Sequence, residues 1–170
     1  MARRTGTRTL YGGRGAWRIA ALLAFLAAPS PALAQGSVSV LPVHGLRFGM
    51  LNTGMPTVIS PLDAGRRATV ELVGSGHVTV LFELPQGLRA GASGPFLPLR
   101  FGATDGRVTF PGTGRVMVFD PAAPLSFNLP PGQGGATIWL GASAQPAAAQ
   151  PPGAYEAAIT VHVVVANPAT

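Results

Sequence analysis

Glycine and proline interrupt this chain at short intervals, and their spacing limits it to short structural elements. The 170 residues include 23 Gly and 17 Pro. After residue 34 most of them stand between runs rich in Val, Thr, Ile and Phe, the usual composition of strands and turns. No stretch there keeps the 3.6-residue apolar period of a helix. The pattern therefore predicts an all-β fold of short antiparallel strands.

The apolar runs suggest about eight to ten strands, a number that suits a two-sheet sandwich. We expect a single domain, because the chain after residue 34 has neither an internal repeat nor a boundary. The expected strands are 37–43 with a continuation over 46–48, 57–59, 66–73, 77–84, 95–101, 108–110, 115–119, 125–129, 136–142 and 155–165.

Three of these segments give more specific expectations. Pro98 cannot donate a backbone hydrogen bond, so the strand over 95–101 is expected at a sheet edge. Asp105 and Gly106 stand between two apolar runs, which predicts a hairpin with a type I′ turn. The last strand alternates most regularly, with one face apolar. That face is formed by Tyr155, Ala157, Ile159, Val161, Val163 and Val165.

The first 34 residues have the pattern of an export signal. Five arginines and no acidic residue precede or border the apolar run 19–28. A basic start, a short apolar run and a small-x-small site are typical of a secretory signal peptide. Ala32 and Ala34 form such a site, which predicts cleavage before Gln35. We therefore expect a signal helix within 1–34 and one domain over 35–170, exported to the periplasm, the cell surface or the medium.

The charge of the remaining chain excludes one class of partner. The whole chain has a formal net charge of +6, but five of its 12 arginines lie within 1–34. Residues 35–170 therefore hold seven Arg against six Asp and Glu, a net charge of +1. Nucleic-acid-binding domains are typically far more basic, so no nucleic-acid partner is expected. No later apolar run reaches the length of a membrane-spanning helix, and we expect no membrane anchor in the mature chain.

The residues that carry chemistry do not form a recognisable catalytic or metal site. Ser143 follows Gly141 at the spacing of a serine-hydrolase elbow, but Gln145 replaces the second glycine. The three histidines and the aspartates lack the spacing of zinc or calcium ligands. The glycine-rich turns lack the lysine and the helix of a phosphate-binding loop. The sequence therefore predicts no enzyme, no metal and no cofactor.

Trp139 and Tyr155 leave two interpretations open. Their aromatic faces could form a platform on which a sugar ring stacks. Alternatively both could pack in the core, since few aromatic residues are available to fill it. The apolar runs in which they stand favour the core.

Five segments together resemble a known bacterial family. They are 46–49 (LRFG), 68–72 (ATVEL), 74–76 (GSG), 139–142 (WLGA) and 152–155 (PGAY). With the alternating strand that follows, they are similar to the secreted family called domain of unknown function 4402. They are more distantly similar to spore-coat-U-type pilin subunits. The resemblance implies an immunoglobulin-like or pilin-like antiparallel β-sandwich that is exported, pilus-like and without known activity.

Two functional hypotheses follow. In the first, the chain is a structural surface subunit that associates with other copies or related subunits by strand addition. The segment 36–43, with Val38 and Val40, is then the candidate donor. With Val38 and Val40, the apolar face of the last strand forms the candidate strand-exchange interface, through Tyr155, Ile159, Val161, Val163 and Val165. In the alternative, a monomeric secreted module keeps that segment in its own sheet and binds a glycan or a surface protein through loops 87–95 or 145–153.

Overall fold

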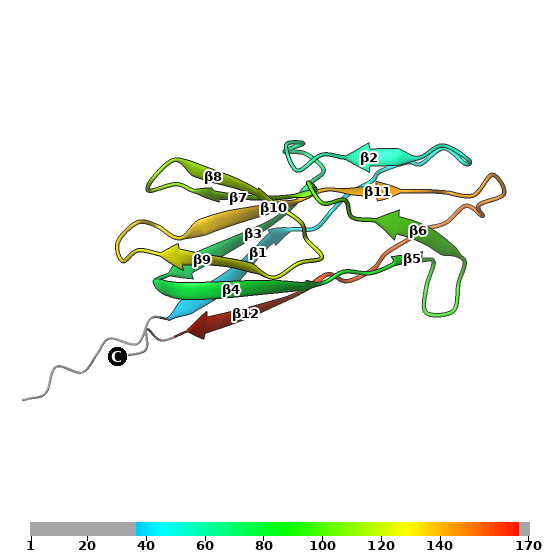
Figure 1. Ribbon diagram of the computed structural model, residues 1–170. Coiled ribbons are helices and arrows are strands. Elements are labelled where there is room, and N and C mark those ends of the chain that lie inside the picture. Colours follow the sequence, from blue (N-terminus) through cyan, green and yellow to red (C-terminus); the bar gives the residue numbers. More distant parts are fainter. Residues whose placement is uncertain (1–36, 167–170) are drawn as a thin grey trace, which may run out of the picture. The chain divides into compact units, whose positions relative to one another are not determined.

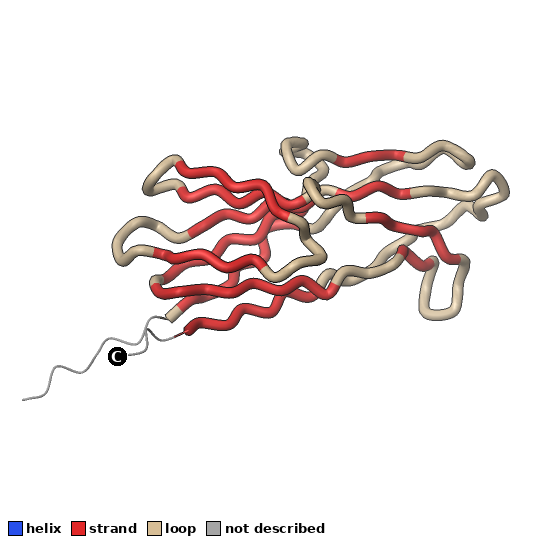
Figure 2. The backbone as a smooth tube through the Cα atoms, in the orientation of Figure 1, coloured by secondary structure: helices blue, strands red, loops and turns tan. Residues whose placement is uncertain are grey.

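A computed structural model describes residues 37–166, and every regular element in that range is a β-strand (Figure 2). The pairings are antiparallel, so the all-β antiparallel fold expected from the sequence is confirmed. No helix in the described range has the length and hydropathy needed to cross a membrane. The expected signal peptide and its cleavage site at Ala32, Ala34 and Gln35 lie outside the described residues.

Twelve short strands follow one another between the turns that Gly and Pro form. Their bounds are β1 Val38–His44, β2 Thr57–Ile59, β3 Ala68–Gly74, β4 Gly76–Glu83, β5 Gly87–Arg89, β6 Phe96–Arg100, β7 Gly106–Phe110, β8 Arg115–Phe119, β9 Leu125–Leu129, β10 Ala136–Leu140, β11 Ala142–Ala144 and β12 Thr160–Ala166.

The strands form three sheets (Figure 1). The five-stranded sheet has the order β1-β3-β10-β7-β8, and the three-stranded sheet has the order β12-β4-β9. These two sheets contribute side chains to one shared core. The four-stranded sheet, β2-β11-β6-β5, lies beyond one end of them and has a smaller core of its own.

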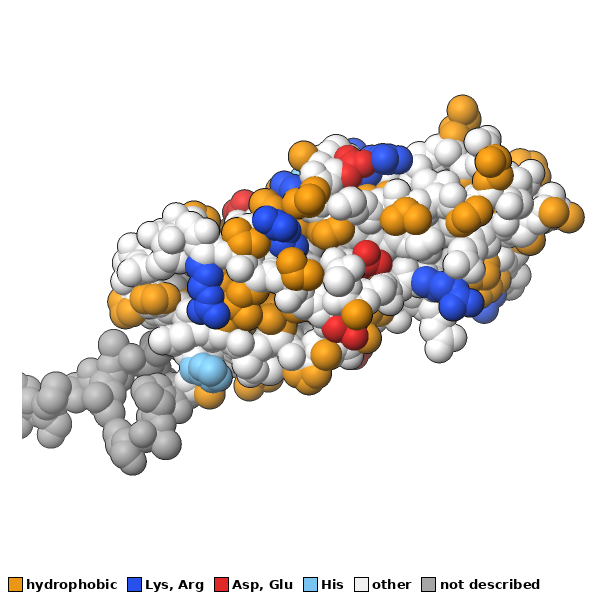
Figure 3. Space-filling view, turned by 45° about the horizontal axis from the view of Figure 1, so that its top comes forward, with side chains coloured by type: hydrophobic (Ala, Val, Ile, Leu, Met, Phe, Trp, Pro, Cys, Tyr) orange, Lys and Arg blue, Asp and Glu red, His pale blue; other side chains and the backbone are white. Residues whose placement is uncertain are grey.

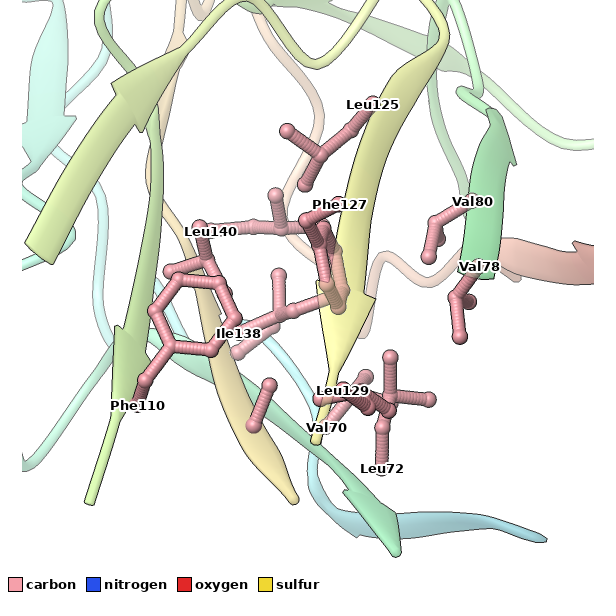
Figure 4. Close-up of a cluster of buried hydrophobic side chains, with 13 residues drawn as sticks. Val70, Leu72, Val78, Val80, Phe110, Leu125, Phe127, Leu129, Ile138 and Leu140 are labelled. Atoms are coloured by element: carbon pink, nitrogen blue, oxygen red, sulfur yellow. The ribbon is translucent and has the colours of Figure 1, made fainter. Parts of the chain in front are cut away.

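The larger core follows from period-2 alternation along the strands. In β9, for example, Leu125, Phe127 and Leu129 are buried and the residues between them are exposed. Figure 4 shows these side chains directed toward those of β3, β7 and β10 across the interior. Phe110 and Phe127 meet edge to face, with ring centroids 5.2 Å apart, a favourable aromatic geometry. Apolar burial of this kind is the main stabilising contribution to the fold.

The segment between β1 and β2 joins the two cores. Leu46 packs against both apolar clusters, and Phe48 is buried in the smaller one. Gly49 has a φ of 69°, a conformation that glycine adopts without a steric penalty. The LRFG motif therefore positions two apolar anchors and a turn. It does not extend β1, so the expected continuation over 46–48 is wrong.

The strand expected over 136–142 is divided between two sheets. It pairs with β3 and β7 as β10 up to Leu140, and then with β2 and β6 as β11 from Ala142. A Cβ at Gly141, the residue between them, would lie 2.2 Å from the carbonyl oxygen of Ile59. Only glycine allows this close approach, so the change of sheet occurs there.

Pro98 lies inside the four-stranded sheet, so its expected place at a sheet edge is wrong. β6 lies between β11 and β5, but its two halves use different neighbours. Leu99 and Arg100 pair with β11, whereas Phe96 to Pro98 pair with β5. Pro98 accepts a hydrogen bond from the Gln145 amide through its carbonyl oxygen. Its missing N–H therefore lies where the pairing with β5 ends and the pairing with β11 begins.

The hairpin expected at Asp105-Gly106 is also wrong. The turn covers Gly102 to Asp105, where the Asp105 carboxylate accepts a hydrogen bond of 2.7 Å from the Gly102 amide. β6 and β7 on either side of it belong to different sheets. A polar residue that caps a turn can therefore connect sheets as readily as it closes a hairpin. The true hairpin in this region joins β7 and β8.

Candidate interaction site

The first and last strands of the described chain lie beside each other at one open side of the larger core. β1 forms the outer edge of the five-stranded sheet and β12 that of the three-stranded sheet (Figure 1). Side chains of both strands pack on the same apolar cluster. Since β1 and β12 belong to different sheets, no ladder of hydrogen bonds joins them. Two strand edges therefore face this side.

Most of the residues predicted to form the exchange interface come together here. Val38 and Val40 of β1 and Val161 and Val163 of β12 all direct their half-buried side chains to the shared core, as does Ile159 just before β12. Val165 is half-buried on the same face of β12.

Tyr155 does not belong to this face. β12 begins at Thr160, so the strand expected over 155–165 is shorter than its alternation suggests. Glu156 instead forms an isolated bridge with Arg89. The Tyr155 side chain packs against the smaller core, and its hydroxyl donates a 2.7 Å hydrogen bond to the carbonyl oxygen of Pro151.

The segment predicted to be a strand donor pairs within its own chain. β1 follows β3 in register from Val38 opposite Gly74 to Pro42 opposite Val70. The Ser75 amide also donates to the Ser37 carbonyl oxygen. The structure thus places the first strand where the alternative hypothesis expected it.

A cavity of about 320 Å³ opens between the ends of β1 and β12. Its walls are largely apolar and include Leu46, Phe48, Ile159 and Val161. Few polar side chains line it, among them those of His44 and Glu156. An apolar hollow between two unpaired edges can accept side chains from an added strand.

β12 differs from the other outer strands of the two facing sheets, because its described residues include none of the usual protective features. Edge strands are usually kept from pairing by proline, charge, a bulge or short length. β1 contains Pro42 and a register shift, and β9 is short and flanked by Pro124 and Pro130. β8 begins with Arg115. β12 has seven residues, TVHVVVA, without proline or glycine, and His162 is its only titratable side chain.

A second hollow involves one of the loops considered in the alternative hypothesis. It measures about 470 Å³ and is lined by Phe48, Leu97 and Tyr155 together with Pro146, Gln150, Pro151, Pro152 and Gly153. Gln150 donates a 2.8 Å hydrogen bond to the Tyr155 hydroxyl, which holds the loop against the ring. Exposed apolar side chains stand out at the same end of the described region (Figure 3).

Trp139 occupies neither of the expected settings. Its strand neighbours Ile138 and Leu140 fill the core, so Trp139 points to the opposite, outer face, where it is partly buried. The interpretation of Trp139 as a core residue is therefore wrong. Tyr155 lies against the smaller core, whereas Trp139 lies on the outer face of the five-stranded sheet, so the two rings do not form one platform. Among the described residues, no group of three or more His, Asp and Glu is arranged to hold a metal ion.

The comparisons add no family to this description: no protein-family model matches the chain, and no similar protein was found among curated proteins or solved structures.

Proposed function

We propose that this protein is an exported structural or interaction protein, a pilus-like surface subunit without catalytic activity that associates through β12. In this proposal the two facing sheets form an immunoglobulin-like or pilin-like sandwich. The proposal rests mainly on one observation, the unprotected edge of β12 beside an apolar hollow. Such an edge offers a row of backbone donors and acceptors to another strand.

The occupant that fits this edge is β12 of a second copy. If two β12 strands pair antiparallel about Val163, Val161 faces Val165 and His162 faces Val164. No like charges are brought together, and the two three-stranded sheets become one of six strands. Because opposite residues share a face, the apolar face continues across the two-fold axis.

The apolar side chains of the two β12 strands favour a pairing in which the added strand covers the hollow. The half-buried valines of the second β12 would lie over the side where the first core is incompletely covered. Burial of apolar area and pairing of free backbone groups would both favour association.

The second hollow supports the alternative, a monomeric secreted binding module. The loop over 145–153 contributes to it and is fixed by Gln150 and Tyr155. A rigid scaffold that carries a shaped loop is a common arrangement for recognition of a glycan or a surface protein.

Val164→Lys tests association through β12. Val164 is 56% exposed and points away from the core, so the charge should leave the monomer intact. In the two-fold pair it alters two cross-strand contacts at once, each worth up to about 1 kcal/mol. We expect the dissociation constant of the dimer to rise about 10- to 30-fold, measured by light scattering behind size exclusion over a dilution series.

Val118→Lys is the matched control. Val118 is 54% exposed on β8, at the opposite edge of the five-stranded sheet, and gains the same charge. Association should be unchanged in this variant. Equal weakening by both variants, or a wild-type protein that stays monomeric at every concentration, would contradict the proposal and favour the binding module.

A further inference from the structure

One row of side chains crosses the outer face of the five-stranded sheet. The antiparallel registers align His44, Thr69, Trp139, Arg107 and Val118, one from each strand. The neighbours of Thr69, Trp139 and Val118 along their strands pack in the core, so these side chains point away from it. Arg107 lies between Trp139 and Val118 in the register and shares their face. His44 and Thr69, at one end of the row, line the cavity beside β12, whereas Trp139 and Arg107 do not.

Arg67 lies over the indole ring of this row. Its Cζ atom is 3.7 Å from the ring centroid of Trp139, a close cation–π contact. Nη1 donates a 3.2 Å hydrogen bond to the Pro61 carbonyl oxygen. Nε is buried and has no hydrogen-bond partner among the described residues. Packing on Trp139 and the hydrogen bond to Pro61 therefore hold the Arg67 guanidinium, and no carboxylate of a described residue forms an ion pair with it.

Arg107 brings a second guanidinium to the same place. It pairs directly with Trp139 across β7 and β10, and its Nε is also buried without a partner in the described part of the chain. Burial lowers the pKa of Arg67, and the positive charge of Arg107 lowers it further, so the two cations are close enough to repel. Bringing like charges together without a counterion is costly.

The acid whose charge acts on Arg67 is already engaged by a different arginine. Asp63 partly offsets the repulsion at Arg67. Its carboxylate, however, forms a 2.7 Å ion pair with Arg66, and this hydrogen bond lowers the pKa of Asp63. Neither Arg67 nor Arg107 forms an ion pair with any described acidic residue.

We propose that Arg67 and Arg107, positioned by Trp139, bind an oxyanion, the carboxylate or phosphate group of a ligand. The planar guanidinium group donates paired hydrogen bonds to such groups. A bound oxyanion would neutralise the repulsion between the two cations, and the indole fixes one of them before the ligand arrives. The preorganised pair lowers the ordering cost of binding.

The fluorescence of Trp139 provides a direct readout. The chain has two tryptophans, so Trp17→Phe in the full chain leaves Trp139 as the only emitter. Inorganic phosphate, acetate and glucuronate are titrated at constant ionic strength maintained with sodium chloride, with glucose as the neutral probe. We expect a saturable change in emission with an anion and none with glucose. Tighter binding of glucuronate than of acetate would assign the oxyanion to an acidic sugar, and equal binding would assign it to a free anion.

Arg67→Gln and Arg107→Gln test the two residues separately. Each removes charge-assisted hydrogen bonds and should weaken binding about 10- to 100-fold. Arg89→Gln removes the same charge from an exposed arginine of β5, outside the five-stranded sheet, and should leave binding unchanged.

Thermal unfolding separates a binding role from a structural one. Because the two cations repel, Arg107→Gln should keep or raise the unfolding temperature in chloride while losing the stabilisation that the anion gives to the parent. A lowered unfolding temperature in chloride with anion binding retained would show a purely structural arginine and overturn the proposal. So would an emission change that chloride reproduces, or one that Arg89→Gln weakens equally.

Discussion

β1 and β12 border the same apolar hollow, and they differ in how each edge is closed. β1 contains Pro42, shifts register near its end and is fixed to the β3–β4 turn through the Ser75 amide. β12 keeps an uninterrupted register with β4 over all seven residues, and no described strand pairs with its outer side. The two strands bury similar faces against one core. Edge protection is therefore a separate property from core packing, and only β1 has it.

The largest expected effect concerns the turn that fixes β1. Gly74 has a φ of 146°, and a Cβ there would lie 1.9 Å from the Ser37 carbonyl oxygen. Gly74→Ala should therefore displace the start of β1 and lower the free energy of unfolding by about 3 kcal/mol or more, from backbone strain and lost contacts together. Chemical denaturation measures the loss.

Gly45→Ala is the control for that substitution. Gly45 follows β1, its φ lies outside the left-handed region, and a Cβ would contact nothing within 4 Å. Its stability should change by less than about 0.5 kcal/mol. Equal losses of stability in the two variants would contradict the argument that Gly74 is needed for the close contact with Ser37 at the start of β1.

A pair of valine truncations compares the two strands directly. Val40 on β1 and Val161 on β12 are both half-buried against the larger core. Val40→Ala and Val161→Ala should each cost about 1 kcal/mol, since each removes two methyl groups from a partly buried site. Urea titrations at two protein concentrations provide the test. A concentration-dependent loss in Val40→Ala alone would mean that β1 pairs between chains.

The sequence predicted the elements of this fold better than their partners. The short apolar runs between turn residues gave β2 and β9 with their observed bounds, because the local composition alone defines them. It could not divide β10 from β11, because the carbonyl oxygen of Ile59, distant in sequence, imposes the break at Gly141. Pro98 likewise lies inside a sheet because two incomplete pairings meet at it.

In the candidate sites, too, local features were predicted and features that depend on distant residues were not. The apolar face of β12 was predicted because it is local to one strand. Tyr155 was assigned to it wrongly, since alternation continues past the point where pairing stops. The cluster of Arg67, Arg107 and Trp139 was missed. Only the register of β3, β10 and β7 brings these three residues together, and no local pattern encodes that register.

Pro42→Val tests whether proline protects β1. The substitution restores a backbone donor in an edge strand and adds a β-branched residue suited to a strand. The free energy of unfolding should change by less than about 1 kcal/mol. Association should become stronger and should no longer be fully reversed by Val164→Lys. Sedimentation velocity of the single and double variants measures this, and unchanged association would show that the register shift alone protects β1.

The smallest effect is expected at the only ion pair that joins β12 to β4 within the described residues. His162 Nε2 lies 2.8 Å from Glu83 Oε1, and both side chains are more than half exposed. Exposed ion pairs contribute little, because water screens the charges and both side chains lose freedom. Glu83→Gln should therefore change stability by less than about 0.5 kcal/mol, measured by thermal unfolding at low and high salt. It should also leave the dissociation constant of the dimer unchanged, since the proposed pairing uses the other edge of β12.

A large loss of stability, or a large rise in the dissociation constant, would contradict this expectation. It would mean that charge, and not the apolar face and the backbone ladder, holds β12 in place. The difference between β1 and β12 would then come from the ion pair of His162 with Glu83 and not from edge protection.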